Sequence, residues 1–213
     1  MSPYLEIPAT KLTDLAWVRA QIGGAAKLYD CARQEVLGTI WWYSLSSVLV
    51  APALESLVAT GTALDPALEA ITLDLVADGR FAGARSSRAL SGDLTDVGSA
   101  LGKALGPVIT TIATATGAHA PALGAIATDS IGNRLLWAGS AAGDVDRAMG
   151  LAGPLVAATD LGMPKPRFVR VGSTPAVRRA SCCLIYEANS PKCASCPRQT
   201  PAERERRLRA ALG

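Results

Sequence analysis

Four of the five cysteines in this chain lie in one short segment near its C-terminal end. They are Cys182, Cys183, Cys193 and Cys196, and they form the pattern C-C-x9-C-x2-C. Thiolates are soft ligands, and four of them complete either a tetrahedral sulfur shell around zinc or the ligand set of an iron–sulfur cluster. The segment is therefore predicted to bind a metal centre.

The spacing of these cysteines favours iron over zinc. A C-x2-C turn is common to both kinds of site, so the turn from Cys193 to Cys196 does not discriminate between them. Cys182 and Cys183 are adjacent, and adjacent side chains diverge on helices and strands alike. Structural zinc sites usually draw their cysteines from C-x2-4-C knuckles, whereas two irons that each need two thiolates can accept a divergent pair. We therefore expect a [2Fe-2S] cluster, with zinc as the alternative.

This segment resembles the cluster-binding end of the FhuF-type ferric-siderophore reductases, in which a Cys-Cys pair and a loop precede a C-x2-C turn. The resemblance is carried by Arg-Ala-Ser-Cys-Cys at 179–183 and Cys-Ala-Ser-Cys-Pro at 193–197, with a loop one residue shorter than in the family. Residues 133–139 are also similar to the family's tryptophan-containing helix. The resemblance implies that all four cysteines hold one [2Fe-2S] cluster. It also implies that the cluster passes one electron to siderophore-bound Fe(III) and releases Fe(II).

Such a mechanism needs an electron donor but no catalytic acid or base. The sequence contains no G-x-G-x-x-G stretch, so a built-in nicotinamide or flavin domain is not indicated. We therefore expect an external donor, either a ferredoxin-like protein or an NAD(P)H-dependent reductase. The alternatives are a zinc- or cluster-binding regulatory module that contacts nucleic acid, and a structural zinc site on an unrelated helical enzyme. The long apolar stretch before the cysteines favours the reductase, so no nucleic-acid partner is expected.

Positive charge accumulates around the cysteines. From residue 164 to the end there are 11 Lys and Arg against 3 acidic residues, although the whole chain carries only +3. The candidates for an electrostatic or docking role are Arg178, Arg179, Lys192 and Arg198. A solvated basic surface is the alternative interpretation of these charges.

Three residues in the middle of the chain are candidates for a substrate pocket. Arg134 and Trp137 fall three apart on one face of a predicted helix, and His119 lies in the loop before it. An arginine beside an aromatic ring can hold a flat, acidic, iron-chelating ligand. Core packing and a surface ion pair are the alternatives.

Cys31 stands apart from the other cysteines and is interpreted as a small buried hydrophobe. The chain starts without a basic region followed by an apolar run, so a cytoplasmic location is expected, in which clustered thiols stay reduced. Two uncharged runs, 36–54 and 104–128, approach the length of a membrane span. Their Ser, Thr, Gly and Pro content favours buried helices, and transient contact with a membrane surface remains an alternative.

The expected fold is mainly helical α+β, with a small antiparallel sheet and a C-terminal cysteine-rich module. The scaffold domain is assigned to residues 1–173 and the cluster-binding module to 174–213. Helical periodicity and capping residues predict helices over 10–29, 33–58, 93–114, 123–148 and 200–212. Strand patterns predict strands over 73–76, 81–90 and 168–171, the first two joined by a hairpin at Asp78-Gly79.

Two further expectations concern side chains and the site. Residues 41–43 are three consecutive aromatics on one predicted helix, so at least one of them must face away from the core. Electron transfer requires close approach of donor and acceptor, so the cluster is expected near a surface groove.

Overall fold

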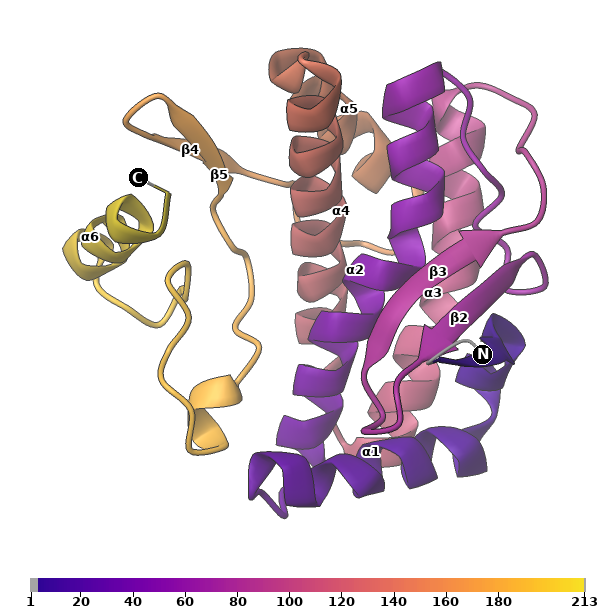
Figure 1. Ribbon diagram of the computed structural model, residues 1–213, viewed down its shortest axis with the longest axis vertical. Coiled ribbons are helices and arrows are strands. Elements are labelled where there is room, and N and C mark those ends of the chain that lie inside the picture. The colour runs from indigo at the N-terminus through magenta and orange to yellow at the C-terminus, as the bar shows by residue number, and fades with distance from the viewer. Residues whose placement is uncertain (1–3, 213) are drawn as a thin grey trace.

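Two long helices run side by side through the centre of the structure, a computed structural model that describes residues 4–212 (Figure 1). They are α2 (Gln34–Thr60) and α4 (Ala120–Ala142), and both begin at the same end of the molecule. The buried indole of Trp42 on α2 donates a hydrogen bond to the carbonyl oxygen of Leu123 on α4, at 2.8 Å. This contact fixes the beginning of α4 against α2.

Helix α2 is the most apolar element of the core. Within residues 4–212 it alone has the length and composition of a membrane span, and 78% of its most apolar 18-residue window is buried inside the protein. Such burial is typical of a core helix, as expected for the run 36–54. The run 104–128 likewise contributes buried residues, such as Val108 and Ile126, to two helices of the core.

Three further helices pack around this pair: α1 (Leu15–Tyr29), α3 (Leu94–Thr116) and α5 (Val145–Ala158). Asp93 caps α3, since its carboxylate accepts hydrogen bonds from two backbone N–H groups of the first turn. The predicted helices over 33–58 and 93–114 are therefore confirmed, with ends that differ by two residues or fewer.

Two predicted helices need correction. The helix expected over 123–148 is wrong, because α4 ends at Gly143, whose φ of 74° lies in the left-handed region that glycine adopts most easily. Asp144 then caps a separate helix, α5. The helix expected over 10–29 starts later than predicted, at Leu15, and a separate 3-10 helix (Ala9–Thr13) precedes it.

A three-stranded antiparallel sheet covers one side of α2. Its strands are β1 (Leu5–Pro8), β2 (Ile71–Leu75) and β3 (Phe81–Ser86), in the order β1-β2-β3. The ring of Phe81 meets that of Trp41 on α2 edge to face, with ring centroids 5.4 Å apart. The predicted hairpin is confirmed and β3 lies at the edge of the sheet, whereas the sequence patterns missed β1.

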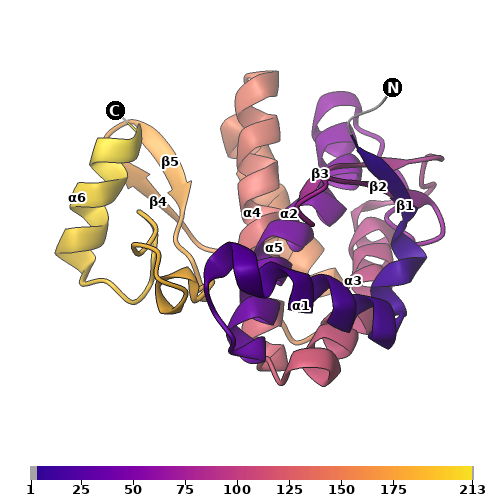
Figure 2. The ribbon, with the colours of Figure 1, turned by 60° about the horizontal axis from the view of Figure 1, so that its bottom comes forward.

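A second, two-stranded sheet lies across α4 from the first sheet (Figures 1 and 2). It pairs β4 (Phe168–Val171) with β5 (Thr174–Val177), so the expectation that 168–171 joins the main sheet is wrong. The expected domain boundary after residue 173 falls in the turn between these strands. The division of the chain into a scaffold domain and a cluster-binding module stays a prediction. The fold class is as expected, mainly helical with small antiparallel sheets.

The last helix, α6 (Pro201–Leu212), packs on this hairpin through its buried Leu208. Glu203 pairs with Arg207 at 2.7 Å, and Glu205 pairs with Arg209 at the same distance and spacing. The helix predicted over 200–212 is therefore confirmed, and i,i+4 ion pairs support it.

Helices α3 and α5 cross at two glycines that leave no room for a side chain. A Cβ atom on Gly98 would lie 2.5 Å from the Cβ of Ala158, and one on Gly102 would overlap the carbonyl oxygen of Thr159. The atoms nearest to Gly102 belong to the backbone of Thr159, so they can move away only if the two helices separate. By contrast, Gly24 on α1 has nothing within 4 Å of an added Cβ.

Replacement by alanine should have opposite effects on the free energy of unfolding at Gly102 and at Gly24. Gly102→Ala should lower the free energy of unfolding by about 1–3 kcal/mol, because it overpacks the crossing. Gly24→Ala should raise it by about 0.8–1 kcal/mol, because alanine is the better helix former at an open position. Urea denaturation followed by circular dichroism would measure both. A Gly102→Ala variant with an unchanged free energy of unfolding would contradict the close crossing of α3 and α5.

Candidate metal centre

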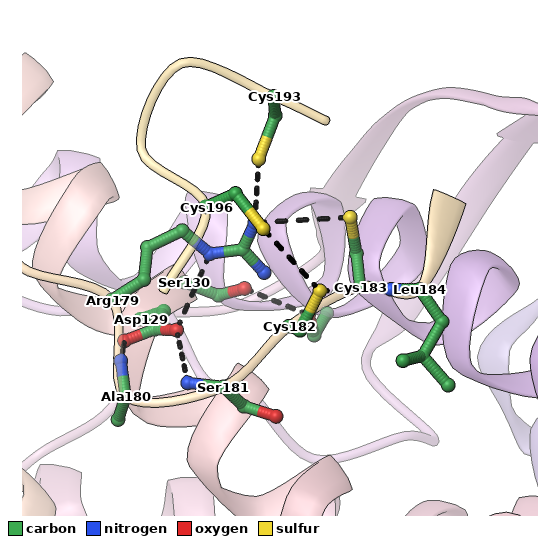
Figure 3. A network of polar contacts seen from close by, with 11 residues as sticks. Asp129, Ser130, Arg179, Ala180, Ser181, Cys182, Cys183, Leu184, Cys193 and Cys196 are labelled. Atoms are coloured by element: carbon green, nitrogen blue, oxygen red, sulfur yellow. Dashed lines mark hydrogen bonds and ion pairs between the residues drawn. The ribbon is translucent and has the colours of Figure 1, made fainter. Parts of the chain in front are cut away.

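The cysteine segment follows β5 and returns to the end of the molecule where α2 and α4 begin. Figure 3 shows the sulfur atoms of Cys182, Cys183, Cys193 and Cys196 gathered beside one arginine, Arg179. Three of the cysteines are buried, and Cys193 is partly exposed. The structure thus brings together the four residues that the sequence singled out.

The four sulfurs form a series of contacts, in which Cys183 interacts with both Cys182 and Cys193, and Cys182 also lies close to Cys196. The sulfurs of Cys182 and Cys196 lie 3.6 Å apart. That is close to the roughly 3.8 Å edge of a tetrahedron with metal–sulfur bonds of about 2.3 Å. Cys183 and Cys193 interact with each other and both accept hydrogen bonds from Arg179.

This arrangement suits two metal ions better than one. Among residues 4–212, no three His, Cys, Asp or Glu side chains are arranged around a common position for a single ion. In a [2Fe-2S] cluster each iron takes only two thiolates, so four neighbouring thiols supply the ligands of both irons. The residues present therefore fit a two-iron cluster.

Ionisation of the four thiols is interdependent. Hydrogen bonding to Cys183, together with burial, raises the pKa of Cys182 and of Cys193. Hydrogen bonds from those two neighbours lower the pKa of Cys183, and the nearby charge of Arg179 adds to that effect. Four adjacent thiolates repel one another, and metal ions supply the positive charge that offsets the repulsion.

Arg179 also points to a missing acceptor. Its Nη2 atom is buried and makes no hydrogen bond to any part of the chain that the structure describes, while its buried Nε atom has only the ion pair with Asp129. A buried donor without a partner costs about 1–3 kcal/mol. An anionic, sulfur-rich group held by the four cysteines is the kind of partner that such donors need.

The arginine is held by a buried carboxylate that the sequence analysis missed. The Arg179 Nε atom lies 3.5 Å from Asp129 Oδ2, and both side chains are almost fully buried. Burial raises the pKa of Asp129, while hydrogen bonds from backbone N–H groups and the charge of Arg179 oppose that rise. Burial alone would lower the pKa of Arg179, but neighbouring acidic groups, Cys183 and Cys193 among them, raise it overall. The guanidinium therefore stays charged.

One signal in the sequence could have identified this carboxylate. Asp129 is the only Asp, Glu, Lys or Arg between residues 104 and 133. A single charged residue in a long apolar helix is rarely buried without a partner. The partner, Arg179, comes from a distant segment and could not be assigned from spacing.

The four predicted docking residues occupy different surroundings. Arg178 is exposed, whereas its neighbour Arg179 is buried against the sulfurs. Lys192 lies over the ring of Tyr186 at 5.4 Å, and Arg198 lies over the same ring at 6.0 Å. The cations therefore divide into one buried at the sulfurs and three at the surface around them.

The loop between the cysteine pairs docks on the beginning of α2. Arg33 forms an ion pair with Glu187, and the Asn189 side chain donates to the backbone oxygen of Asp30 at 3.4 Å. An apolar cluster lies beneath these contacts, and Cys31 packs against it. Cys31 packs against apolar residues as a small hydrophobe would, but it is only partly buried, so the expected burial is not complete. Its exclusion from the ligand set stays a prediction.

A pocket of about 500 Å³ lies between the cysteine segment and the scaffold. The scaffold lines it with residues of α2 and of the turn between α3 and α4, and the cysteine segment lines the other side. The lining includes Glu35, Thr39, His119, Ala122, Ser181, Cys182 and Arg198. One cysteine of the motif thus borders a pocket, as expected of a centre near a surface groove.

The three predicted pocket residues do not share one site. His119 lines the pocket beside Cys182. Arg134 instead donates to the Ser47 carbonyl oxygen at 2.9 Å and pairs with Glu55. Trp137 is 52% exposed, lies 5.1 Å from the Arg134 guanidinium, and lines a separate pocket near the end of α4.

Comparison with known proteins agrees with this geometry. Residues 179–198 match the family model described as the FhuF 2Fe-2S C-terminal domain. The match begins at Arg179 and includes all four cysteines, so the FhuF-type assignment is confirmed for this segment. The domain implies a [2Fe-2S] cluster as the cofactor. No curated protein and no solved structure matches the chain.

Replacement of single cysteines should distinguish ligands from bystanders. Each of Cys182→Ser, Cys183→Ser, Cys193→Ser and Cys196→Ser should remove or strongly weaken the visible absorption of the purified protein. Cys31→Ser is the matched control and should leave the spectrum unchanged. Iron and sulfide analysis of each variant checks the result. A cluster that survives in one of the four variants, or that is lost in the Cys31→Ser variant, would contradict the assignment.

Proposed function

We propose that this protein is an iron–sulfur oxidoreductase that reduces ferric siderophores. In this proposal Cys182, Cys183, Cys193 and Cys196 hold the [2Fe-2S] cluster, which accepts and donates one electron at a time. The observation that carries the proposal is the pocket that borders directly on Cys182. Among the described pockets it is the one lined by a residue of the motif, so a ligand bound there lies beside the cluster's own thiolate.

The chemistry of the pocket wall suits an iron chelate built from oxygen donors. Arg198 offers a cation, His119 offers a ring nitrogen, and the hydroxyls of Thr39 and Ser181 can donate or accept hydrogen bonds. These groups can bind the oxygen-rich outer face of a chelate through charge and hydrogen bonds. They would hold the acceptor close to Cys182 and orient it there.

Reduction then favours release of the metal. Hard oxygen donors bind the more highly charged ion more tightly, so the chelate loses affinity when its Fe(III) gains one electron and becomes Fe(II). The electron enters the protein from an external donor, which we propose to be a ferredoxin-like protein or an NAD(P)H-dependent reductase. The acceptor takes one electron in each turnover, so no proton need be transferred by the pocket residues.

Obstruction of the pocket tests this function. Ala122→Phe places a large side chain on the pocket wall, and it should slow oxidation of the reduced cluster by a ferric siderophore by about tenfold or more, because a small misplacement of reactants is costly. Oxidation by hexacyanoferrate, which needs no pocket, should keep its rate. Stopped-flow absorption measures both reactions.

The matched control is Ala141→Phe, which makes the same change in the pocket near Trp137. It should leave both rates unchanged. If Ala141→Phe instead slows the siderophore reaction, the substrate site lies by Arg134 and Trp137. If the wild-type protein reduces no ferric chelate, the proposed function fails.

Positive charge at the pocket should govern the encounter with anionic chelates. Arg198→Gln removes a cation from the pocket wall, so it should slow reduction of a negatively charged ferric chelate at low ionic strength. The difference should shrink as salt is raised, because charges more than about 8–10 Å apart are screened at physiological salt. Arg209→Gln, on α6, removes the same charge away from this pocket and should have a smaller effect. Equal effects of the two variants would contradict a local role for Arg198.

A further inference from the structure

A buried guanidinium lies between the cysteine sulfurs and helix α4 (Figure 3). The Nη1 atom of Arg179 donates to Cys193 Sγ at 3.3 Å and to Cys183 Sγ at 3.8 Å. The side chains of Arg179 and Asp129 are only 1% and 2% exposed. A positive charge is thus fixed against sulfur in a region with little water, where electrostatic interactions are strongest.

The carboxylate of Asp129 holds both the arginine and the backbone beside it. It accepts hydrogen bonds from the N–H groups of Ala180, at 2.8 Å, and Ser181, at 3.3 Å, in addition to its ion pair with Arg179. One side chain of α4 therefore fixes the arginine and the chain that leads directly into Cys182.

Tyr43 covers the guanidinium from the other side. Its ring lies 4.5 Å from the Arg179 guanidinium carbon, within the range of a cation–π interaction. Of the three consecutive aromatics on α2, Trp41 and Trp42 are buried and Tyr43 is 37% exposed, as expected for at least one of them. The partly exposed Tyr43 thus packs on Arg179 and shields its guanidinium from solvent.

The contacts of the arginine are asymmetric. It donates to Cys183 and Cys193. Cys182 borders the pocket, and among the described residues it accepts no hydrogen bond from Arg179. The cation therefore contacts the sulfurs through two cysteines that do not line the pocket.

We propose that Arg179 sets the reduction potential of the cluster, and that Asp129 and Tyr43 are positioning residues that hold it in place. The proposal rests on the ligand assignment in the proposed function. Reduction adds one negative charge to a cluster that four thiolates already make anionic. A cation that donates hydrogen bonds to two of those sulfurs stabilises the reduced form, so it raises the potential.

A neighbouring arginine provides the matched control. Arg179→Gln should shift the reduction equilibrium toward the oxidised form by about tenfold or more, which for a one-electron couple is about 59 mV. Arg178→Gln removes the same charge one residue away, but at an exposed position, so its shift should be much smaller. Redox titration of the purified holoproteins, followed by absorption and electron paramagnetic resonance, measures both. Equal shifts in the two variants, or none in either, would overturn the proposal.

The role of Asp129 is tested by a double-mutant cycle on the same potential. If Asp129 holds Arg179 against the sulfurs, the shift caused by Arg179→Gln should be at most about half as large in an Asp129→Asn background. If the two side chains act independently, the shift is the same in both backgrounds, and the positioning role is overturned. A purely structural role for Asp129 would change stability without this coupling.

Tyr43 gives a second test that does not depend on cluster retention in the Asp129 variant. Tyr43→Phe keeps an aromatic face over the guanidinium and should keep the potential of the wild-type protein. Tyr43→Leu removes that face and admits water, so the potential should fall. An unchanged potential in Tyr43→Leu would overturn the positioning role of this ring.

These titrations use no siderophore, so their outcome is independent of ferric-chelate reduction. A wild-type protein that fails to reduce chelates but gives the expected shifts would end the proposed function and support the role of Arg179. A protein that binds zinc in place of iron would overturn both proposals.

Discussion

The buried carboxylate of Asp129 joins the two parts of this molecule on which any function depends. It lies on α4, which packs mainly against other helices, and its hydrogen bonds are directed to the cysteine segment. A buried carboxylate without partners would be strongly destabilising, so this helix favours the docked position of the segment. The scaffold and the sulfur site are therefore coupled through this charged side chain as well as through the loop that docks on α2.

Local signals in the sequence predicted much of this structure, and long-range contacts account for what they missed. Asp93 as a helix cap and Asp78-Gly79 as a hairpin turn act on their near neighbours, so their patterns could be interpreted directly. The strand at 168–171 was also found, but its partner depends on which strands the chain brings together, and a local pattern does not contain that information. The helix end at Gly143 was missed because the apolar residues continue across it.

At the candidate site, too, local sequence patterns identified neighbouring residues but not the long-range contacts. The four cysteines lie within 15 residues, and the sequence identified them together with the metal chemistry expected of them. Their environment is made by α2 and by the turn between α3 and α4, which lie far away in the chain. His119 therefore reaches the pocket beside Cys182, whereas Arg134, on the same helix as Asp129, faces Ser47 and Glu55. Spacing along one helix could group Arg134 with Trp137, but it could not reveal which side of that helix the cysteines would occupy.

The contacts that dock the cysteine segment on α2 have a consequence for how the protein matures. The ion pair of Arg33 with Glu187, the hydrogen bond of Asn189 and the apolar cluster beneath them all involve residues other than the cysteines. Small metal-dependent modules are unfolded until they bind their ion, because the ion supplies most of their stability. In this protein, contacts with α2 and Asp129 that do not involve the metal hold the segment on the scaffold. Insertion of the cluster can therefore be a late step of biogenesis, carried out on a folded chain.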